Sequence, residues 1–276
     1  MGARARTSQR RRAGILGAVR LSQLRRPVER AAVRRRLTWQ AGTVVDLVSE
    51  TAQTRSIALE LPKWAGHRSG QHVDVRLTAD DDYQAQRSYS IASAPDDDHV
   101  VLTVQRLKDG EVSPFLVDEL RIGDELELRG PIGGYFVWED SLGGPLLLVA
   151  GGSGIVPFRS MLRHHRAVHS TVPVRLLCSV RSLPLMIYRD ELMQVAAYDA
   201  FDVSVTLTQE QPDGWRGYRR RIDMEMLAEV AWSPSEQPLV YVCGPTPFVE
   251  TAANSLVELG HAASRIRTER FGGTGA

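Results

Sequence analysis

The sequence predicts two domains: an antiparallel β-barrel followed by a doubly wound α/β domain with a parallel sheet. The chain has 276 residues, which is enough to bury two ordinary cores. Its first half consists of short alternating segments, whereas its second half alternates apolar runs with helical segments. The rhythm changes near Gly143-Gly144-Pro145, so we expect the barrel over residues 37–140 and the α/β domain over residues 141–276.

The barrel is predicted from short segments in which apolar and polar residues alternate. Clusters of Gly, Pro and Asp separate these segments, as is usual between β-strands. Many short strands with one brief helix indicate an antiparallel barrel. The expected strands cover residues 43–48, 56–61, 72–77, 100–105 and 125–128.

The α/β domain is predicted from apolar runs that alternate with helical candidates, which is the βαβ order of a parallel sheet covered on both faces. Gly260 is the expected C-cap of the last helix. The expected strands cover residues 146–150, 174–180, 203–207, 239–242 and 265–268, and the expected helices cover residues 157–169, 189–198, 223–230 and 246–259.

A glycine-rich turn joins the first apolar run of this domain to its first helix, between Leu146 and Pro157. Bare glycine backbone lets a phosphate approach the amide N–H groups and the positive end of the helix. Pro157 stands where the dinucleotide pattern G-x-G-x-x-G has its third glycine. Taken alone, the turn is equally compatible with a tight connection that binds nothing.

Two segments of the barrel carry side chains suited to a phosphorylated aromatic ligand. In Arg87-Ser-Tyr-Ser90, at the end of a barrel strand, an arginine can contact a phosphate and a tyrosine can stack on a ring. In the segment 110–116, Ser113 is the expected N-cap and Pro114 the first residue of a short helix. Its free N–H groups would suit a second phosphate. An ordinary strand and simple capping are the alternatives.

The amino-terminal segment is strongly basic. Residues 1–36 hold twelve arginines and one acid, a net charge of +11, and the rest of the chain sums to −10 to give +1. Such an arm suits nucleic acid or an anionic membrane, but it is equally typical of a disordered extension. We expect a partly disordered extension and no nucleic-acid partner. Arg11-Arg12 resembles a twin-arginine signal, but no cleavage site follows, so export is not expected.

Membrane spans, disulfide frameworks and metal centres are not expected. The longest uncharged run, residues 141–158, contains five glycines and two prolines. The only cysteines, Cys178 and Cys243, exclude a four-cysteine cluster built from this chain alone and favour a reducing cytoplasm. His165 and His169 lie one helical turn apart without a third ligand nearby, so a solvated helix face is expected there.

Six motifs in one order resemble the ferredoxin–NADP reductase superfamily, over residues 38–276. They are R-x-Y-S (Arg87, Tyr89, Ser90), G-x-x-S (Gly110, Ser113), the segment 130–136, G-G-x-G-I-x-P (residues 151–157), Cys243-Gly-Pro245 and Glu269-Arg-Phe271. The resemblance implies that the barrel binds FAD. Arg87 and Ser113 would hold the pyrophosphate, Tyr89 would pack on the flavin ring, and Ser90 would lie near N5. Ser88, Gln105, Gly110 and Val112 complete the expected cofactor-binding residues of the barrel.

The resemblance also implies a nicotinamide dinucleotide in the second domain. Its phosphates would lie over Gly152 and Gly154, and Cys243 would lie beside the nicotinamide. Phe271 and Glu269 would close the other side of the flavin, so that Ser90, Cys243, Glu269 and Phe271 form the expected catalytic group. The remaining expected cofactor-binding residues of this domain are Gly151, Ser153, Pro157, Gly244 and Pro245.

The choice of dinucleotide depends on what meets the adenosine ribose, where an acid favours NADH and an arginine favours NADPH. Cys178-Ser-Val-Arg181 offers a serine and an arginine, and Arg189 adds a second cation. NADPH is therefore expected, and NADH stays open. The basic segment 215–221 is a second candidate for phosphate or acceptor docking, with a solvated loop as the alternative.

The implied activity is that of a cytoplasmic flavin-dependent NAD(P)H oxidoreductase. It would move a hydride from NAD(P)H to FAD and then single electrons to a separate ferredoxin, heme or molybdenum protein. A separate acceptor is expected because the chain lacks the cysteines of a fused [2Fe–2S] domain. The alternatives are a non-catalytic electron-transfer or regulatory subunit of a larger redox complex, and a diaphorase or flavin reductase acting on small acceptors.

Overall fold

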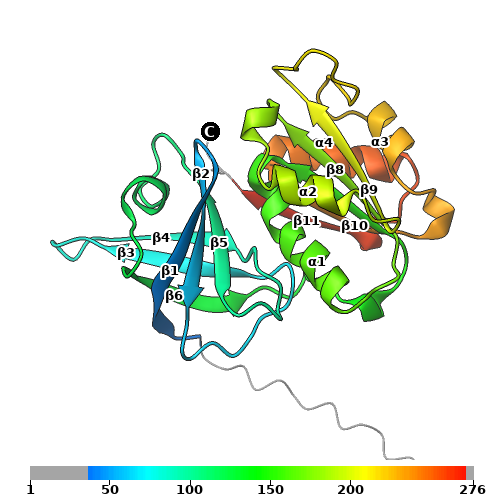
Figure 1. Cartoon of the computed structure of the whole chain (residues 1–276). Helices are drawn as coiled ribbons and strands as arrows, with labels where there is room; N and C mark the ends of the chain where they lie inside the picture. Colours follow the sequence, from blue (N-terminus) through cyan, green and yellow to red (C-terminus); the bar gives the residue numbers. More distant parts are fainter. Residues whose placement is uncertain (1–36, 272–276) are drawn as a thin grey trace, which may run out of the picture. The chain divides into compact units, whose positions relative to one another are not determined.

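A six-stranded antiparallel sheet forms the first half of the computed structural model, which describes residues 37–271 (Figure 1). The strands pair in the order β4-β3-β6-β1-β2-β5. Directly after β4, Ile91 forms an antiparallel bridge with Leu102 of β5, so the sheet closes into a barrel. The strands are β1 (Trp39–Thr51), β2 (Thr54–Glu60), β3 (His72–Thr78), β4 (Gln84–Ser90), β5 (Val100–Gln105) and β6 (Glu125–Ile132).

The barrel interior is filled by inward-facing aliphatic side chains from alternate strand positions. Ile57 and Leu59 of β2, with Leu102 and Val104 of β5, are fully or almost fully buried. A single helical turn, η1 (Phe115–Glu119), packs on β2 and β5 and buries Leu116 in the same core. Alternation therefore gives the barrel one apolar face per strand.

A five-stranded parallel sheet forms the second half, with the strand order β11-β10-β7-β8-β9. Its strands are β7 (Leu146–Gly151), β8 (Val174–Val180), β9 (Phe201–Leu207), β10 (Leu239–Pro245) and β11 (Ile266–Phe271). The helices between them are α1 (Val156–Ala167), α2 (Arg189–Val195), α3 (Met224–Val230) and α4 (Thr246–Glu258). Short turns lie at η2 (Asp140–Leu142), η3 (Gly152–Ile155), η4 (Leu183–Leu185), η5 (Pro234–Glu236) and η6 (Ala263–Arg265).

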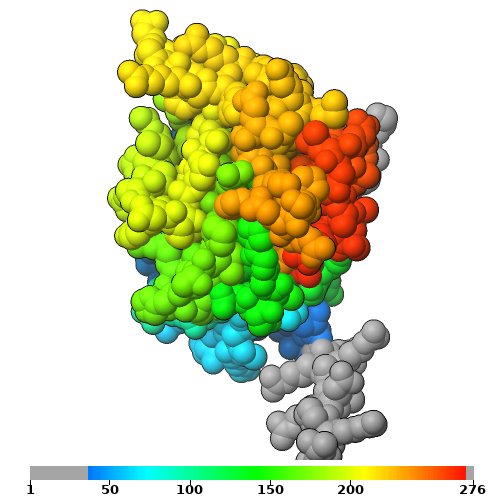
Figure 2. Space-filling view, turned by 90° about the vertical axis from the view of Figure 1, so that its right-hand side faces the viewer, coloured from blue at the N-terminus to red at the C-terminus, as the bar shows by residue number. Residues whose placement is uncertain are grey.

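Both faces of this sheet are covered, so its central strand is apolar throughout. Leu146 and Leu148 of β7 belong to the core that α1 and α2 close. Leu147 and Val149 belong to the opposite core, closed by α3 and α4. Figure 2 shows this second helical layer from outside, with α3 and α4 in orange and red-orange. The continuous apolar run predicted for a doubly covered parallel strand is confirmed.

The order of the strands creates a switch point between β7 and β10. From β7 the chain continues to β8 and β9 on one side, and then returns past β7 to β10 and β11 on the other. Ligands of open α/β sheets bind outside the carboxyl ends of the strands at such a point. The loop after β7 and the end of β10 therefore define the first place to look for a site.

The predicted fold class is confirmed, and the differences have local causes. The predicted bounds of β5 and β8 match the structure, and Gly260 follows α4 with the positive φ of a C-cap, +94°. The strand end expected at Arg87–Ser90 is the end of β4, but the start of β4 was not predicted, because only Ala85 in this strand is buried. Ser113 is predicted to be the N-cap of the short helix, but Pro114 occupies that position. The hydroxyl of Ser113 instead accepts a hydrogen bond from the N–H of Leu107.

The basic extension, membrane spans and metal sites are further features for which the sequence makes predictions. Residues 1–36 lie outside the described residues. Over residues 37–271, no helix is long and apolar enough to cross a membrane. The same part of the chain holds no cluster of three or more His, Cys, Asp or Glu side chains arranged for a metal. His165 is buried, not solvated as predicted, and contacts the carbonyl of Val172 at 2.7 Å.

Candidate active site

Glycines let the ends of β7 and β10 come together at the switch point. A Cβ on Gly154 would lie 2.1 Å from the carbonyl oxygen of Cys243. A Cβ on Gly151 or Gly244 would lie 2.8 or 2.7 Å from the ring of Phe248. Real Cβ atoms do not approach other atoms so closely. Gly154 lies against backbone and therefore requires glycine, whereas a side chain at Gly151 or Gly244 would have to displace the ring of Phe248.

Gly152 differs from these three glycines, because the space that a side chain would occupy is free. Its φ of +55° favours glycine, and no atom lies within 4 Å of the position of a Cβ. The turn η3 starts here and leads directly into α1, whose amino terminus thus lies behind the loop. Free space above bare backbone, next to the positive end of a helix, fits a phosphate group. The loop therefore fits the dinucleotide that the glycine pattern predicts.

A cavity of about 450 Å³ lies over this loop, and we call it the switch-point cavity. Its volume falls in the range of about 300–1,000 Å³ that is common for small-molecule sites. Among residues 37–271, Arg181 and Arg221 are its charged side chains and no acidic residue lines it. Its walls are formed by Gln53, Gln105, Gly151, Gly152, Ser153, Ser179, Val180, Arg181, Leu185, Ile187, Thr208, Gln209, Arg221, Ile222, Pro245, Pro247, Phe248, Thr251 and Phe271.

The structure brings seven of the predicted site residues together on this cavity: Gln105, Gly151, Gly152, Ser153, Arg181, Pro245 and Phe271. Four others, Gly154, Pro157, Cys243 and Gly244, are buried behind the wall. Arg189 is exposed at the start of α2 and is not part of the lining.

Arg221 and Phe248 line the cavity although they are absent from the predicted residues. Arg221 is the last residue of the basic segment 215–221. That segment is a predicted candidate for phosphate or acceptor docking, but Arg221 itself is not among the predicted cofactor-binding residues. The segment between β9 and α3 that carries it is yellow and projects at the top of both views (Figures 1 and 2). Phe248 lies in the first turn of α4, where nothing in the sequence distinguishes it from a core aromatic.

The two barrel motifs meet at Glu111. Nη2 of Arg87 lies 2.6 Å from Oε2 of Glu111, and the hydroxyl of Tyr83 lies 2.9 Å from Oε1. The Arg87 side chain is 53% exposed, so this ion pair is weak and its guanidinium is free to exchange a carboxylate for a phosphate. Gly110 lets the turn close, since a Cβ there would lie 2.7 Å from Oγ of Ser113. This rim fits a pyrophosphate.

The other predicted barrel residues differ in accessibility: Tyr89 is half-buried, Val112 is buried and Ser88 is exposed. Tyr89 packs against the barrel core, and burial raises the pKa of its phenol to about 12, so it is neutral. Val112 is fully buried. The hydroxyl of Ser88 donates to Oδ1 of Asp74 at 2.6 Å, while Nη2 of Arg129 donates to Oδ2 at 2.7 Å. Ser88 is thus engaged in the barrel wall.

A hydrogen bond connects the barrel to the parallel sheet next to Cys243. The hydroxyl of Ser90 donates to Oε1 of Glu269 at 3.0 Å, and Glu269 pairs in register with Cys243 on the neighbouring strand. Burial raises the pKa of Glu269, although the bond from Ser90 opposes this shift. Burial and the charge of Glu269 raise the pKa of the Cys243 thiol well above 9. Cys243 is therefore a thiol and not a nucleophilic thiolate.

A barrel followed by a switch-point α/β sheet with a phosphate-binding loop defines a two-domain flavin and dinucleotide oxidoreductase. Residues 42–137 match the family described as the oxidoreductase FAD-binding domain, and residues 148–254 match the oxidoreductase NAD-binding domain. The chain belongs to the ferredoxin–NADP reductase superfamily. Its domains bind FAD and NAD(P)H.

Two relatives are reductase components of oxygenases. The chain is 31% identical over 246 residues to the glycine betaine monooxygenase reductase subunit of Pseudomonas aeruginosa, covering 86% of this chain and 66% of that protein. It is 32% identical over 235 residues to the 3-ketosteroid-9-alpha-monooxygenase ferredoxin reductase component of Rhodococcus rhodochrous, covering 83% and 64%. The chain thus spans about two thirds of the length of these relatives.

Solved structures share the whole described fold. The FAD/NAD binding domain of nitric oxide dioxygenase from Vibrio cholerae matches with a TM-score of 0.76 and 25% identity, covering 85% of this chain and 99% of that chain. The cytochrome P450 reductase of Amycolatopsis matches with a TM-score of 0.75 and 26% identity, covering 85% and 70%. Both agree with the two-domain arrangement.

The raised pKa of Glu269 predicts a pH dependence of stability. Because the folded-state pKa lies above the ordinary value of 4.5, the folded protein favours the protonated carboxyl, and its stability falls as the pH rises from 4.5 through the raised pKa. Glu269→Gln keeps a neutral side chain at every pH. We expect this variant to be more stable than the parent at pH 8 and similar at pH 4.5 in urea unfolding.

Glu258→Gln at an exposed position of α4 is the control, and its free energy of unfolding should follow that of the parent at both pH values. An advantage of Glu269→Gln of the same size at both pH values would contradict the raised pKa of Glu269.

Proposed function

We propose that this chain is the reductase of a redox system, oxidising NAD(P)H at the switch-point cavity and passing electrons to a separate protein. The observation that carries the proposal is that both domains line one cavity. Gln53 and Gln105 come from the barrel side, and Gly152 and Ser153 come from the parallel sheet. We place the boundary between the FAD-binding and NAD(P)-binding domains near residue 140, and the amino-terminal extension at residues 1–36.

FAD, when bound, supplies the redox chemistry, because it accepts a hydride and releases electrons singly. Arg87 holds its pyrophosphate at the barrel rim, and the turn at Gly110 and Ser113 supports this contact. The half-buried ring of Tyr89 offers a neutral aromatic surface to the flavin. The exposure of Arg87 and its exchangeable partner Glu111 support this assignment.

Ser90, Glu269, Cys243 and Phe271 form the catalytic group in this proposal. The hydroxyl of Ser90, in the barrel, donates a hydrogen bond to Glu269 of the parallel sheet, and burial raises the pKa of that carboxyl. The buried thiol of Cys243 keeps the region behind the cavity wall free of charge and water. Phe271, opposite Pro245 in the strand register, covers the reacting face from the cavity side.

The open space over Gly152 and the amino terminus of α1 bind the phosphates of the dinucleotide. Arg181 and Arg221 then select NADPH, because a 2′-phosphate gains from two cations while no acid in the lining favours a free ribose hydroxyl. Arg189 lies outside the cavity lining, so no contact with the 2′-phosphate is assigned to it.

The acceptor is an oxygenase component or a ferredoxin-like protein in this proposal, since two relatives are named as reductase components of monooxygenases. The two cysteines of the chain are both buried and unpaired, which supports a reducing, cytoplasmic compartment. A non-catalytic subunit and a diaphorase acting on small acceptors are the competing functions.

The proposal predicts that the purified full chain binds FAD and that NADPH removes the yellow absorbance within a single turnover without any partner. The measurement is stopped-flow absorbance under anaerobic conditions. A flavin that NADPH and NADH both leave oxidised would support the non-catalytic subunit. Protein that stays colourless with excess FAD would refute the proposed function altogether.

A second prediction concerns the choice of dinucleotide. Arg181→Ala and Arg221→Ala should each weaken NADPH binding by about tenfold or more, the effect expected for a lost charge-assisted hydrogen bond, and change NADH binding little. Isothermal titration with each nucleotide measures both affinities. Arg189→Ala is the matched control and should bind NADPH like the parent. Equal weakening for both nucleotides would remove the arginines from 2′-phosphate recognition.

A further inference from the structure

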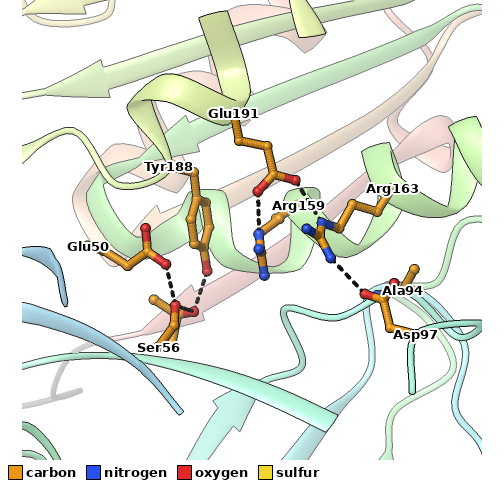
Figure 3. A network of polar contacts seen from close by, with 9 residues as sticks. Glu50, Ser56, Ala94, Asp97, Arg159, Arg163, Tyr188 and Glu191 are labelled. Carbon is orange, nitrogen blue, oxygen red and sulfur yellow. Dashed lines mark hydrogen bonds and ion pairs between the residues drawn. The ribbon is translucent and has the colours of Figure 1, made fainter. Parts of the chain in front are cut away.

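A chain of hydrogen bonds joins the barrel to the α/β domain next to the switch-point cavity (Figure 3). The hydroxyl of Tyr188, just before α2, donates to Oγ1 of Thr103 on β5. Thr103 shares a second hydrogen bond of 2.8 Å with Ser56 on β2, and the hydroxyl of Ser56 donates to Glu50 at 2.6 Å. The hydroxyl of Tyr188 is therefore hydrogen-bonded to a polar site of the barrel in which the hydroxyls of Thr103 and Ser56 also have partners.

The backbone of Tyr188 is held in an unfavourable conformation. Its φ of 58° and ψ of 28° are left-handed, which is rare for a bulky aromatic residue. Its side chain is buried, and the guanidinium of Arg159 lies 4.7 Å from the centre of its ring. Such a conformation persists only where surrounding contacts fix it, and sites of this kind cluster at ligand-binding segments. The contacts with Thr103 and Arg159 are what fix it here.

Ion pairs hold the neighbouring helix in the same place. Glu191 of α2 accepts hydrogen bonds from Arg159 at 2.8 Å and from Arg163 at 2.7 Å, both on α1. Arg163 also donates to Asp97 of the barrel at 2.9 Å (Figure 3). Asp97 is itself fixed by the N–H of Ala94. The start of α2 is thus tied to α1 and to the barrel.

This connection lies directly behind two walls of the switch-point cavity. Ile187, which lines the cavity, is the residue before Tyr188. Gln105, which lines it from the barrel, is two residues beyond Thr103 on β5, and therefore on the same side of that strand. A single hydrogen bond thus joins the strand of one wall to the segment of the other.

We infer that Tyr188 and Thr103 are positioning residues that fix the separation of these two walls and thereby align NAD(P)H with the barrel. The inference rests on the proposed function, because it presupposes that the cavity holds the dinucleotide. Neither residue lines the cavity, so both act through Ile187 and Gln105. Loss of the bond lets the segment 183–188 relax from its strained backbone, which widens the cavity and lowers the fraction of aligned complexes.

The test compares hydroxyl-deleted variants of the full FAD-loaded chain, using stopped-flow flavin reduction over a range of NADPH concentrations. Tyr188→Phe keeps the ring and its contact with Arg159. It should raise the apparent Kd for NADPH or lower the limiting reduction rate by about three- to tenfold, the effect of one buried hydrogen bond, with unchanged FAD content. Thr103→Val should give the same change, and Thr103→Ser, which keeps the hydroxyl, should behave like the parent.

Two further variants separate positioning from general destabilisation. The double variant Tyr188→Phe/Thr103→Val should be no worse than either single variant, because all three lack the same bond. Tyr241→Phe removes an equally buried tyrosine hydroxyl, which donates to the carbonyl of Val137 at 2.7 Å away from the cavity lining. This control should bind and oxidise NADPH like the parent.

Parental kinetics of Tyr188→Phe, fully additive effects in the double variant, or an equal defect in Tyr241→Phe would each overturn the inference. These outcomes all require a parent that NADPH reduces. A parent that NADPH does not reduce refutes the proposed function instead, so the two failures are distinguishable.

Discussion

The rest of the structure depends on the close approach of two strand ends that only glycine permits. At Gly154 any side chain would meet the carbonyl of Cys243 at 2.1 Å, so β10 could not lie against the loop after β7. That approach places η3 and the amino terminus of α1 at the switch point of the sheet. It also leaves the open space over Gly152 as the floor of the cavity. The proposed phosphate site therefore follows from packing between backbones, not from any particular polar side chain.

Burial separates the proposed site into two electrostatic environments. Arg181 and Arg221 line an accessible cavity, and their positive charge suits an anionic dinucleotide. Behind the wall, burial raises the pKa of both Glu269 and Cys243, so it disfavours charge on the groups nearest the junction of the domains. In the proposed function, phosphate recognition and the transfer of reducing equivalents therefore lie in different environments, as expected where the cofactor supplies the chemistry and the protein supplies alignment.

The sequence predicted what depends on local patterns. Apolar runs predicted β8 and the covered parallel sheet, because a doubly covered strand has no polar face. β4 gave no such signal, since a rim strand with one buried residue does not alternate. The bond between Ser90 and Glu269 joins residues 179 positions apart, and the left-handed Tyr188 is fixed by the barrel, so neither was readable from local sequence. Arg221 reached the cavity through a loop whose course no pattern predicts.

We propose that the space over Gly152 holds the phosphates of the dinucleotide. Asparagine tolerates left-handed backbone better than other residues with a side chain, so Gly152→Asn should fold while filling that space. The measurement is isothermal titration of NADP⁺ into the FAD-loaded parent and variant, with thermal unfolding of both in parallel. We expect Gly152→Asn to have near-parental stability and to show no measurable binding of NADP⁺. A stable variant that binds NADP⁺ with parental affinity would contradict it.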